Sequence, residues 1–323
     1  MFYCISVLIQ TYDKGEIHLE TNFLEISNLH KSFGHKNVLK NINFSMQKGH
    51  IVGLIGANGA GKTTIMKAIL GILTFDGKIT IANQEVSINQ HRPLESVGAL
   101  IEYPGLYPYL TGREQLRLFA TGKNREEKVN NIIQKLHMER FANQKTKSYS
   151  LGMKQKLGVG LALLNDPQLV ILDEPMNGLD PKATKELRDL IVSEKNNGVT
   201  FLISSHILSE LQRIADDVVV INHGEIVTAT TMENLLAANK KFYLIETDNN
   251  QLTADLLLRN NYQVEQQAAL KIPITDNFSI NNLLQLLLSA NITILDIKQQ
   301  DGDLEESLLQ VLDGQGAQND NLN

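Results

Sequence analysis

The sequence predicts an α/β protein with a doubly wound, mostly parallel sheet, followed by a smaller α+β unit. One observation is a set of three near-continuous apolar runs separated by helix-length segments: LVILD (169–173), VTFLIS (199–204) and DVVVI (217–221). Such runs are typical of parallel strands that helices cover on both faces. A second observation is the glycine-rich stretch GANGAGKTT (56–64), which lies between an apolar run and a helix-like segment. The third is a change of pattern after residue 238.

The earlier elements follow from local patterns. Short strands alternate with turns up to about residue 55, a helix is expected at 62–72, and strands return at 78–86 and 97–101. From about 104 to 165 the pattern is helical, which implies an inserted helical subdomain. Within it, TGRE has the form of a capping box, and a long helix is expected after a serine in YSLGMKQ.

Composition sets outer bounds on function. The 323 residues are 42% hydrophobic, which is ample for a buried core, and one cysteine, Cys4, excludes both a disulfide framework and a cysteine zinc site. A net charge of −6 without a sustained Lys/Arg run argues against nucleic acid as a partner, because binding phosphates along a duplex needs clustered cations. Since no window approaches the roughly 18 apolar residues of a membrane span, we expect the chain itself not to cross a membrane.

Residues 1–22 precede the first convincing strand, and we expect them to be a poorly ordered extension. The tripeptide KGE (14–16) is what a purine-rich ribosome-binding site encodes when it is translated. We therefore hypothesise that synthesis in the native host begins at Leu19, read from an alternative start codon. An intact mass of the native protein that includes residues 1–18 would refute this hypothesis.

The glycine-rich stretch has the residue types that a phosphate ligand demands. Gly56, Gly59 and Gly61 let the backbone curl so that N–H groups point at phosphate oxygens. The helix expected to begin near Lys62 adds the positive end of its dipole, the lysine can reach the β and γ phosphates, and Thr63 offers a hydroxyl to Mg²⁺. A glycine-rich turn with a chance GKT is the alternative, but the full GxxxxGK[ST] spacing favours a nucleotide site. Its predicted residues are Gly56, Ala57, Asn58, Gly59, Ala60, Gly61, Lys62, Thr63 and Thr64.

Two adjacent carboxylates, Asp173 and Glu174, follow the apolar run LVIL. Open α/β sheets place ligands at the carboxyl ends of their strands, so Asp173 is expected to hold Mg²⁺, in part through water. Glu174 is then placed to polarise an attacking water as general base. The alternative is a pair of solvated acids at an exposed turn.

Three further stretches, together with the glycine-rich loop, resemble the ordered motifs of ATP-binding-cassette (ABC) ATPases. They are YSLGMKQKLGVGLALL (149–164), which is similar to the family signature in a variant form, NGLDP (177–181) and SSHILSE (204–210). The resemblance implies a P-loop cassette over 23–238 with a parallel-sheet core, an antiparallel β subdomain and a helical subdomain over about 104–165. It also implies that Phe33, in HKSFG, places its ring against adenine.

The resemblance further implies a head-to-tail pair of subunits, in which ATP on the glycine loop of one meets the signature of the other. The residues themselves agree, because a serine hydroxyl and free N–H groups before an apolar helix form an outward-facing anion site. In this reading His206 contacts the γ phosphate and Asp180 signals between the two sites. The implied signature residues are Ser150, Leu151, Gly152, Met153, Lys154 and Gln155.

The sequence departs from the family pattern at Glu102, where most members carry glutamine. A carboxylate would ligate Mg²⁺ more strongly than an amide but would lie unfavourably near the γ phosphate, so altered metal dependence is expected. The alternative is that Glu102 merely faces solvent. Glutamate at this position together with the SLGMKQ signature resembles the subfamily of bacterial ABC ATPases associated with bacitracin and lantibiotic self-protection. The following loop, Tyr103 to Tyr109, is where the family contacts its membrane subunit, although simple packing is equally open.

After residue 238 the motifs stop, and the segments read in order as βαββαβ. We expect a small ferredoxin-like unit over 239–313, closed by a helix in DLEESLLQVL, and a disordered tail at 314–323. This unit could dimerise, sense a ligand or brace the cassette.

The sequence therefore predicts the ATP-hydrolysing subunit of a bacterial exporter, with ATP and Mg²⁺ as cofactors, a second copy and separate transmembrane permease subunits as partners, and no nucleic acid. It would act at the cytoplasmic face of the membrane and drive efflux of an antimicrobial peptide or similar compound. An exporter for a drug, lipid or polysaccharide is the alternative, and a soluble ABC protein without transport is a further one. A protein that holds ATP without turnover is disfavoured because Lys62 and Glu174 are both present.

Overall fold

The computed structural model describes residues 22–237, 241–266, 269–275 and 278–301. The predicted N-terminal extension, the closing helix after residue 301 and the tail lie outside these described residues.

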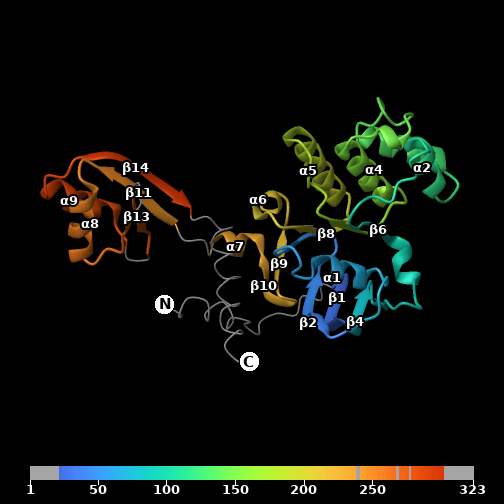
Figure 1. Cartoon of the computed structure of the whole chain (residues 1–323), viewed down its shortest axis with the longest axis horizontal. Coiled ribbons are helices and arrows are strands. Elements are labelled where there is room, and N and C mark those ends of the chain that lie inside the picture. Colours follow the sequence, from blue (N-terminus) through green and yellow to red (C-terminus); the bar gives the residue numbers. More distant parts are fainter. Residues whose placement is uncertain (1–21, 238–240, 267–268, 276–277, 302–323) are drawn as a thin grey trace.

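A six-stranded sheet forms the centre of the cassette, in the order β10-β9-β3-β8-β7-β6. The pairs from β9 through β6 are parallel, and β10 joins β9 antiparallel. This arrangement confirms the predicted fold class (Figure 1). The strands are β3 (Ile51–Ile55), β6 (Val97–Leu100), β7 (Leu169–Asp173), β8 (Thr200–Ser205), β9 (Asp217–Asn222) and β10 (Glu225–Thr231).

Each face of this sheet packs against its own hydrophobic core. On β3, Ile51 and Ile55 belong to one core and Val52 and Leu54 to the other, because successive side chains of a strand point to opposite faces. One core is covered by α4 (Leu151–Leu163) and α5 (Pro181–Asn196), and the other by α1 (Lys62–Ile69) and an antiparallel sheet (Figure 1). Burial on both faces explains why these strands read as continuous apolar runs.

The antiparallel sheet has the order β2-β1-β4-β5. The single strand expected at 78–86 is a hairpin of β4 and β5 instead, because Ala82 and Asn83 adopt positive φ angles of 47° and 63° and turn the chain. The strands are β1 (Leu24–Phe33), β2 (Lys36–Met46), β4 (Asp76–Ile81) and β5 (Gln84–Glu85).

The inserted segment is less helical than its pattern indicates, because an irregular stretch precedes α2 (Gly112–Phe119) and loops flank α3 (Arg125–Lys135). The capping box is present, since the Glu114 N–H donates to Thr111 Oγ1 at 3.1 Å and the Thr111 N–H donates to Glu114 Oε2 at 2.7 Å. Shorter elements complete the cassette: η1 (Arg92–Ser96), η2 (Thr146–Ser148), α6 (Leu208–Leu211) and α7 (Met232–Ala237).

The C-terminal unit has the expected βαββαβ order and a four-stranded antiparallel sheet, β12-β13-β11-β14. Its own core contains Ile245, Leu257, Leu270, Leu283 and Leu287. This strand order with two helices between strands is the ferredoxin-like arrangement. The elements are β11 (Lys241–Thr247), α8 (Asn250–Arg259), β12 (Glu265–Gln266), β13 (Leu270–Pro273), α9 (Ile280–Ser289) and β14 (Ile294–Asp301).

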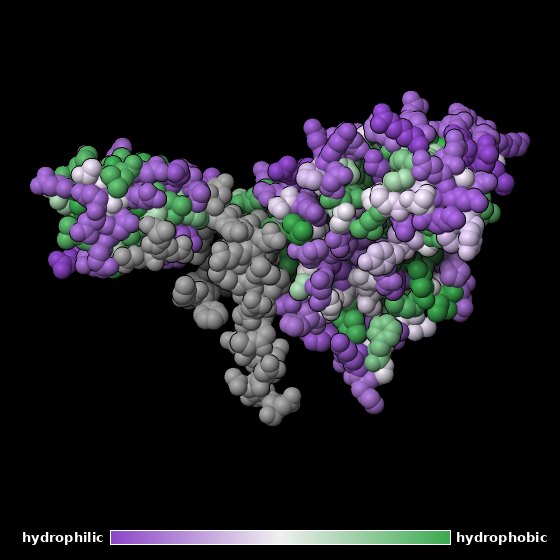
Figure 2. All heavy atoms as spheres, turned by 45° about the horizontal axis from the view of Figure 1, so that its top comes forward, coloured by the Kyte–Doolittle hydropathy of each residue, from purple (hydrophilic) through white to green (hydrophobic). Residues whose placement is uncertain are grey.

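Hydrophilic residues cover much of the visible face of the cassette, and apolar residues show in smaller groups between them (Figure 2). Within the described ranges, none of the helices combines the length and the apolarity that crossing a bilayer requires.

Candidate active site

The glycine-rich loop joins β3 to α1, and its shape depends on glycine at defined positions. Gly59 and Gly61 have φ angles of 83° and 117°, which side chains other than glycine rarely adopt. At Gly56 a Cβ atom would lie 2.4 Å from the carbonyl oxygen of Ile221, so a larger residue does not fit. Gly61 is also the N-cap of α1 and offers no side-chain cap to the first N–H groups of the helix. This leaves those N–H groups suited to an anion.

Lys62 lies at the start of α1 and is 5% exposed. Its ammonium donates to the carbonyl oxygens of Gly56 at 2.7 Å and Ala57 at 3.3 Å, and lies 3.3 Å from Glu174 Oε1. The lysine therefore holds its charge beside the curled loop, where an anion on the loop would face it.

Thr63 and Asp173 come together from α1 and the end of β7. The Thr63 hydroxyl donates to Asp173 Oδ2 at 2.8 Å, and the Ser204 hydroxyl donates to Oδ1 at 2.6 Å. In the described ranges no three His, Cys, Asp or Glu residues form a metal cluster. One hydroxyl and one carboxylate nevertheless fit Mg²⁺, which is usually held by one or two protein oxygens together with waters and phosphates.

Glu174 lies between two groups that can carry positive charge. Its Oε2 is 2.8 Å from Nδ1 of His206, and Oε1 faces Lys62. The backbone of Glu174 is left-handed, with φ 47°, and its N–H donates to Ser204 Oγ at 2.8 Å. Oε1 is buried and accepts no hydrogen bond from the residues that the structure describes, so it retains the capacity to accept one from water.

The signature begins α4. The Ser150 hydroxyl is the N-cap and accepts from the Met153 N–H at 3.3 Å. Leu151 is 45% exposed, whereas Gln155 is buried and Lys154 half-buried. No hydrogen bond among the described residues joins 150–155 to 56–64, so the two motifs are separate sites within one chain.

The signature packs against the NGLDP loop. A Cβ atom on Gly178 would lie 2.4 Å from Leu151 Cδ2, so the glycine allows the leucine to cross this loop. Asp180 is the N-cap of α5, with Oδ1 accepting from the Ala183 N–H at 2.9 Å. The starts of α4 and α5 therefore lie side by side.

Both helix starts open onto a groove of about 640 Å³, lined in part by Ser150, Gly152 and Asp180. Arg140 and Lys182 also line it. The carboxylates of Glu139, Asp180 and Glu186 and the ammonium of Lys156 line it too, so the groove carries both charges, with the two helix N-termini adding positive ends of dipoles. Arg140 and Lys182 lie outside the sequence motifs, and tertiary packing brings both side chains near the signature.

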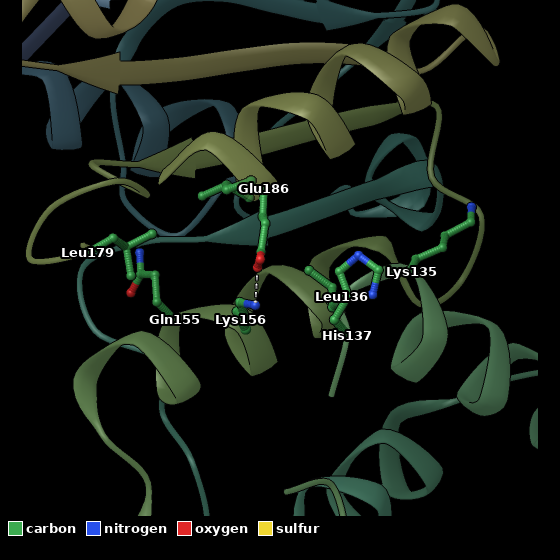
Figure 3. A pocket seen from close by; sticks show the side chains of 8 residues that line it. Lys135, Leu136, His137, Gln155, Lys156, Leu179 and Glu186 are labelled. Atoms are coloured by element: carbon green, nitrogen blue, oxygen red, sulfur yellow. Dashed lines mark hydrogen bonds and ion pairs between the residues drawn. The ribbon is translucent and has the colours of Figure 1, made fainter. Parts of the chain in front are cut away.

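Ion pairs connect the helical subdomain to α5. Lys156 of α4 reaches Glu186 of α5 at 2.7 Å beside a small cavity of about 10 Å³, as Figure 3 shows. The hydrogen bond from Lys156 holds the pKa of Glu186 below its usual value. A second pair joins Lys135 of α3 to Glu194 at 2.7 Å.

The remaining predicted residues lie around this centre. Phe33, at the end of β1, is 53% exposed, and Lys31 Nζ lies 4.8 Å from its ring centroid. Glu102 is 60% exposed, has φ 60° and pairs with Lys67 at 2.6 Å rather than with Thr63 or Asp173.

Comparison with known proteins agrees with this geometry. A family model described as ABC transporter matches residues 39–177. The lantibiotic transport ATP-binding protein SrtF of Streptococcus pyogenes is 41% identical over 63% of this chain and 89% of its own length. The bacitracin transport ATP-binding protein BcrA of Bacillus licheniformis is 30% identical over 91% of this chain and 98% of its own. A solved structure titled as the ATP-binding subunit of an ABC transporter superposes with a TM-score of 0.62 at 32% identity, over 67% of this chain and 92% of that one.

The chain belongs to the ATP-binding subunits of ABC transporters. It is accordingly an ATPase of the cassette type, as the motifs predict.

Proposed function

We propose that the chain binds MgATP on loop 56–64 and hydrolyses it as one of two identical subunits. Hydrolysis would drive export of an antimicrobial peptide or a similar amphipathic compound through separate membrane subunits. A continuous chain of contacts at the ends of β7 and β8 and the start of α1 carries the catalytic part of this proposal. Its members are Lys62, Thr63, Asp173, Glu174, Ser204 and His206.

Nucleotide binding would use the whole loop. Backbone N–H groups and the start of α1 face the phosphates, and Lys62 exchanges its two carbonyl contacts for phosphate oxygens. The exposed ring of Phe33 is available to stack on adenine. Thr63 Oγ1 and Asp173 Oδ2 would hold Mg²⁺, with Glu102 as a further ligand. Bound there, Mg²⁺ supplies positive charge against the phosphates.

Glu174 is the general base in this mechanism. A water that donates to Glu174 Oε1, in place of the Lys62 ammonium that now faces this atom, loses a proton to the carboxylate as its oxygen attacks the γ phosphorus, and ADP leaves in line. Lys62 and His206 flank the carboxylate and stabilise the charge that develops on the transferred group.

The second copy would complete the site. The groove beside Ser150 and Gly152 combines the starts of α4 and α5 with Arg140 and Lys182, which would face the triphosphate of another subunit, while Glu139, Asp180 and Glu186 lie at the same groove. Asp180 lies at the same groove, which supports its predicted role between the two sites.

The substrate class is supported by the relatives whose names record lantibiotic and bacitracin transport. Tyr103 and Tyr109 are 82% and 74% exposed on the loop predicted to meet the permease, at the cytoplasmic face of the membrane. We also propose that the cassette spans 23–238 and an accessory unit 239–313.

The test is Glu174→Gln, with Glu85→Gln on exposed β5 as the matched control. The amide cannot take the proton, so we expect ATP binding to persist, turnover to fall by about two to four orders of magnitude, and MgATP to trap a dimer. Radiolabelled ATP hydrolysis and size-exclusion chromatography measure the two effects. Turnover in the glutamine variant equal to that of the control would show that Glu174 is not the base.

A further inference from the structure

Lys67 and Glu102 form an ion pair at 2.6 Å, and Lys67 lies one helical turn along α1 from Thr63. Lys67 follows Thr63 by four residues on α1, so the two side chains share a face of the helix, about 6 Å apart along its axis. Side chains on a helix tilt toward its N-terminus, which brings the Lys67 ammonium back toward the turn that carries Thr63.

Strand register places Glu102 at the carboxyl end of β6, beside the carboxyl end of β7. β6 and β7 are parallel neighbours with Leu100 opposite Leu172. Two residues further on, Glu102 therefore follows β6 at the level where Glu174 follows β7, and both residues have left-handed backbones with φ 60° and 47°. Neighbouring strands are about 4.8 Å apart, so this register places Glu102 and Glu174 after the same ends of adjacent strands.

We propose that Lys67 is a positioning residue. It keeps the Glu102 carboxylate away from the cation site by pairing with it, and it releases the carboxylate when Mg²⁺ binds. The inference rests on the proposed role of Glu102 as a cation ligand. With Lys67 paired, the Glu102 charge is neutralised where it would otherwise repel the γ phosphate of metal-free ATP. The pair is also exposed, with side chains 32% and 60% accessible. Exposed pairs contribute little net stability because water screens both charges, so a divalent cation can displace this one.

Two opposite effects of Lys67→Met follow. Without the ammonium, Glu102 repels metal-free ATP, and we expect the Kd for a fluorescent ATP analogue in EDTA to rise about threefold to fivefold. The same free carboxylate is more available to Mg²⁺, so the Mg²⁺ concentration for half-maximal tight binding of the analogue should fall by a similar factor. A lesion of α1 would weaken both kinds of binding together.

The experiment titrates the analogue in EDTA and in Mg²⁺ with the full chain, for wild type, Lys67→Met, Lys67→Arg, Glu102→Gln and the Lys67→Met/Glu102→Gln double variant. We expect Lys67→Arg to have the wild-type Kd in EDTA and the wild-type Mg²⁺ dependence. We expect Lys67→Met to change neither quantity when residue 102 is already glutamine. Thermal melting checks that all five proteins are folded.

The outcomes separate the two claims. If Glu102→Gln changes the Mg²⁺ dependence but Lys67→Met does not, the positioning role is wrong and the ligand role stands. If Glu102→Gln leaves the Mg²⁺ dependence unchanged, the ligand role fails and the inference fails with it. An equal effect of Lys67→Met with glutamate or glutamine at 102 would also overturn the inference, since the lysine would then act through the helix.

Discussion

At the scale of single residues, two glutamates that follow the carboxyl ends of neighbouring strands share an unusual backbone conformation. Glu102 and Glu174 are both left-handed, a conformation that costs a non-glycine residue roughly 1–2 kcal/mol. At Glu174 the surrounding contacts offset this cost, because the N–H donates to Ser204 and the carboxylate faces Lys62 and His206. These contacts therefore hold the base between two groups that can be cationic, in spite of the backbone strain.

Phe33 offers a direct test of the adenine contact. Replacing the ring by alanine should raise the Kd for MgATP about twofold to tenfold, because stacking of this kind is worth roughly 0.5–1.5 kcal/mol. Phe33→Trp should keep the affinity and report binding by a change in fluorescence, since the natural chain contains no tryptophan. Unchanged affinity in Phe33→Ala, measured by calorimetry, would remove Phe33 from the site.

The motif residues could be read from the sequence, but their connecting partners could not. Ser204 stands within SSHILSE, yet its bonds to Asp173 and to the Glu174 N–H depend on the pairing of β7 with β8. The pairing of Lys67 with Glu102 depends in the same way on α1 lying beside the end of β6. Spacing along the chain identifies residues that bind a known kind of ligand. Pairs of side chains from different helices or strands can be identified only once the fold is known.

At the scale of elements, α4 lies unusually close to β6. A Cβ atom on Gly98 would be 1.8 Å from the carbonyl oxygen of Ala162, so glycine sets the distance between this helix and the sheet. The sequence predicts both elements from their periodicity, but this contact joins residues 64 positions apart (162 minus 98) and has no local signal. The hairpin at 76–85 was missed for a related reason, because its turn carries neither Gly nor Pro.

Gly98→Ala should therefore destabilise the cassette by about 1–3 kcal/mol, since the helix must shift to admit the methyl group. Gly105→Ala is the matched control, because nothing lies within 4 Å of its added Cβ atom. We expect the control to change stability by less than about 0.5 kcal/mol. Urea denaturation followed by circular dichroism measures both, and equal midpoints for the two variants would contradict the packing argument.

At the scale of the whole molecule, the cassette and the C-terminal unit have separate hydrophobic cores. The cassette was predictable because its strands are buried on both faces and its motifs are ordered. The βαββαβ order of the second unit was predictable from periodicity, but its role was not, because periodicity reports burial and not ligands.

Leu257→Ala tests whether the two units are energetically separate. Leu257 is fully buried in α8, and its truncation should cost the C-terminal unit about 2–5 kcal/mol. Because no residue of the candidate active site belongs to that core, the Kd for MgATP should stay within about twofold of wild type. Denaturation and nucleotide titration of the full chain give the two values, and a large loss of ATP affinity would show that the units are coupled.

The position of β6 in the central sheet has a mechanical consequence. Among the described strands of this sheet, β6 is one of the two edge strands, with β10 at the other edge, and it pairs only with β7. The segments that carry Lys62, Asp173 and His206 adjoin interior strands. A force applied to the tyrosine-rich segment after β6 would be resisted only by the backbone hydrogen bonds between β6 and β7. Because the interior strands are each paired on both sides, movement of this edge would shift Glu102 and its loop while the interior groups kept their mutual spacing.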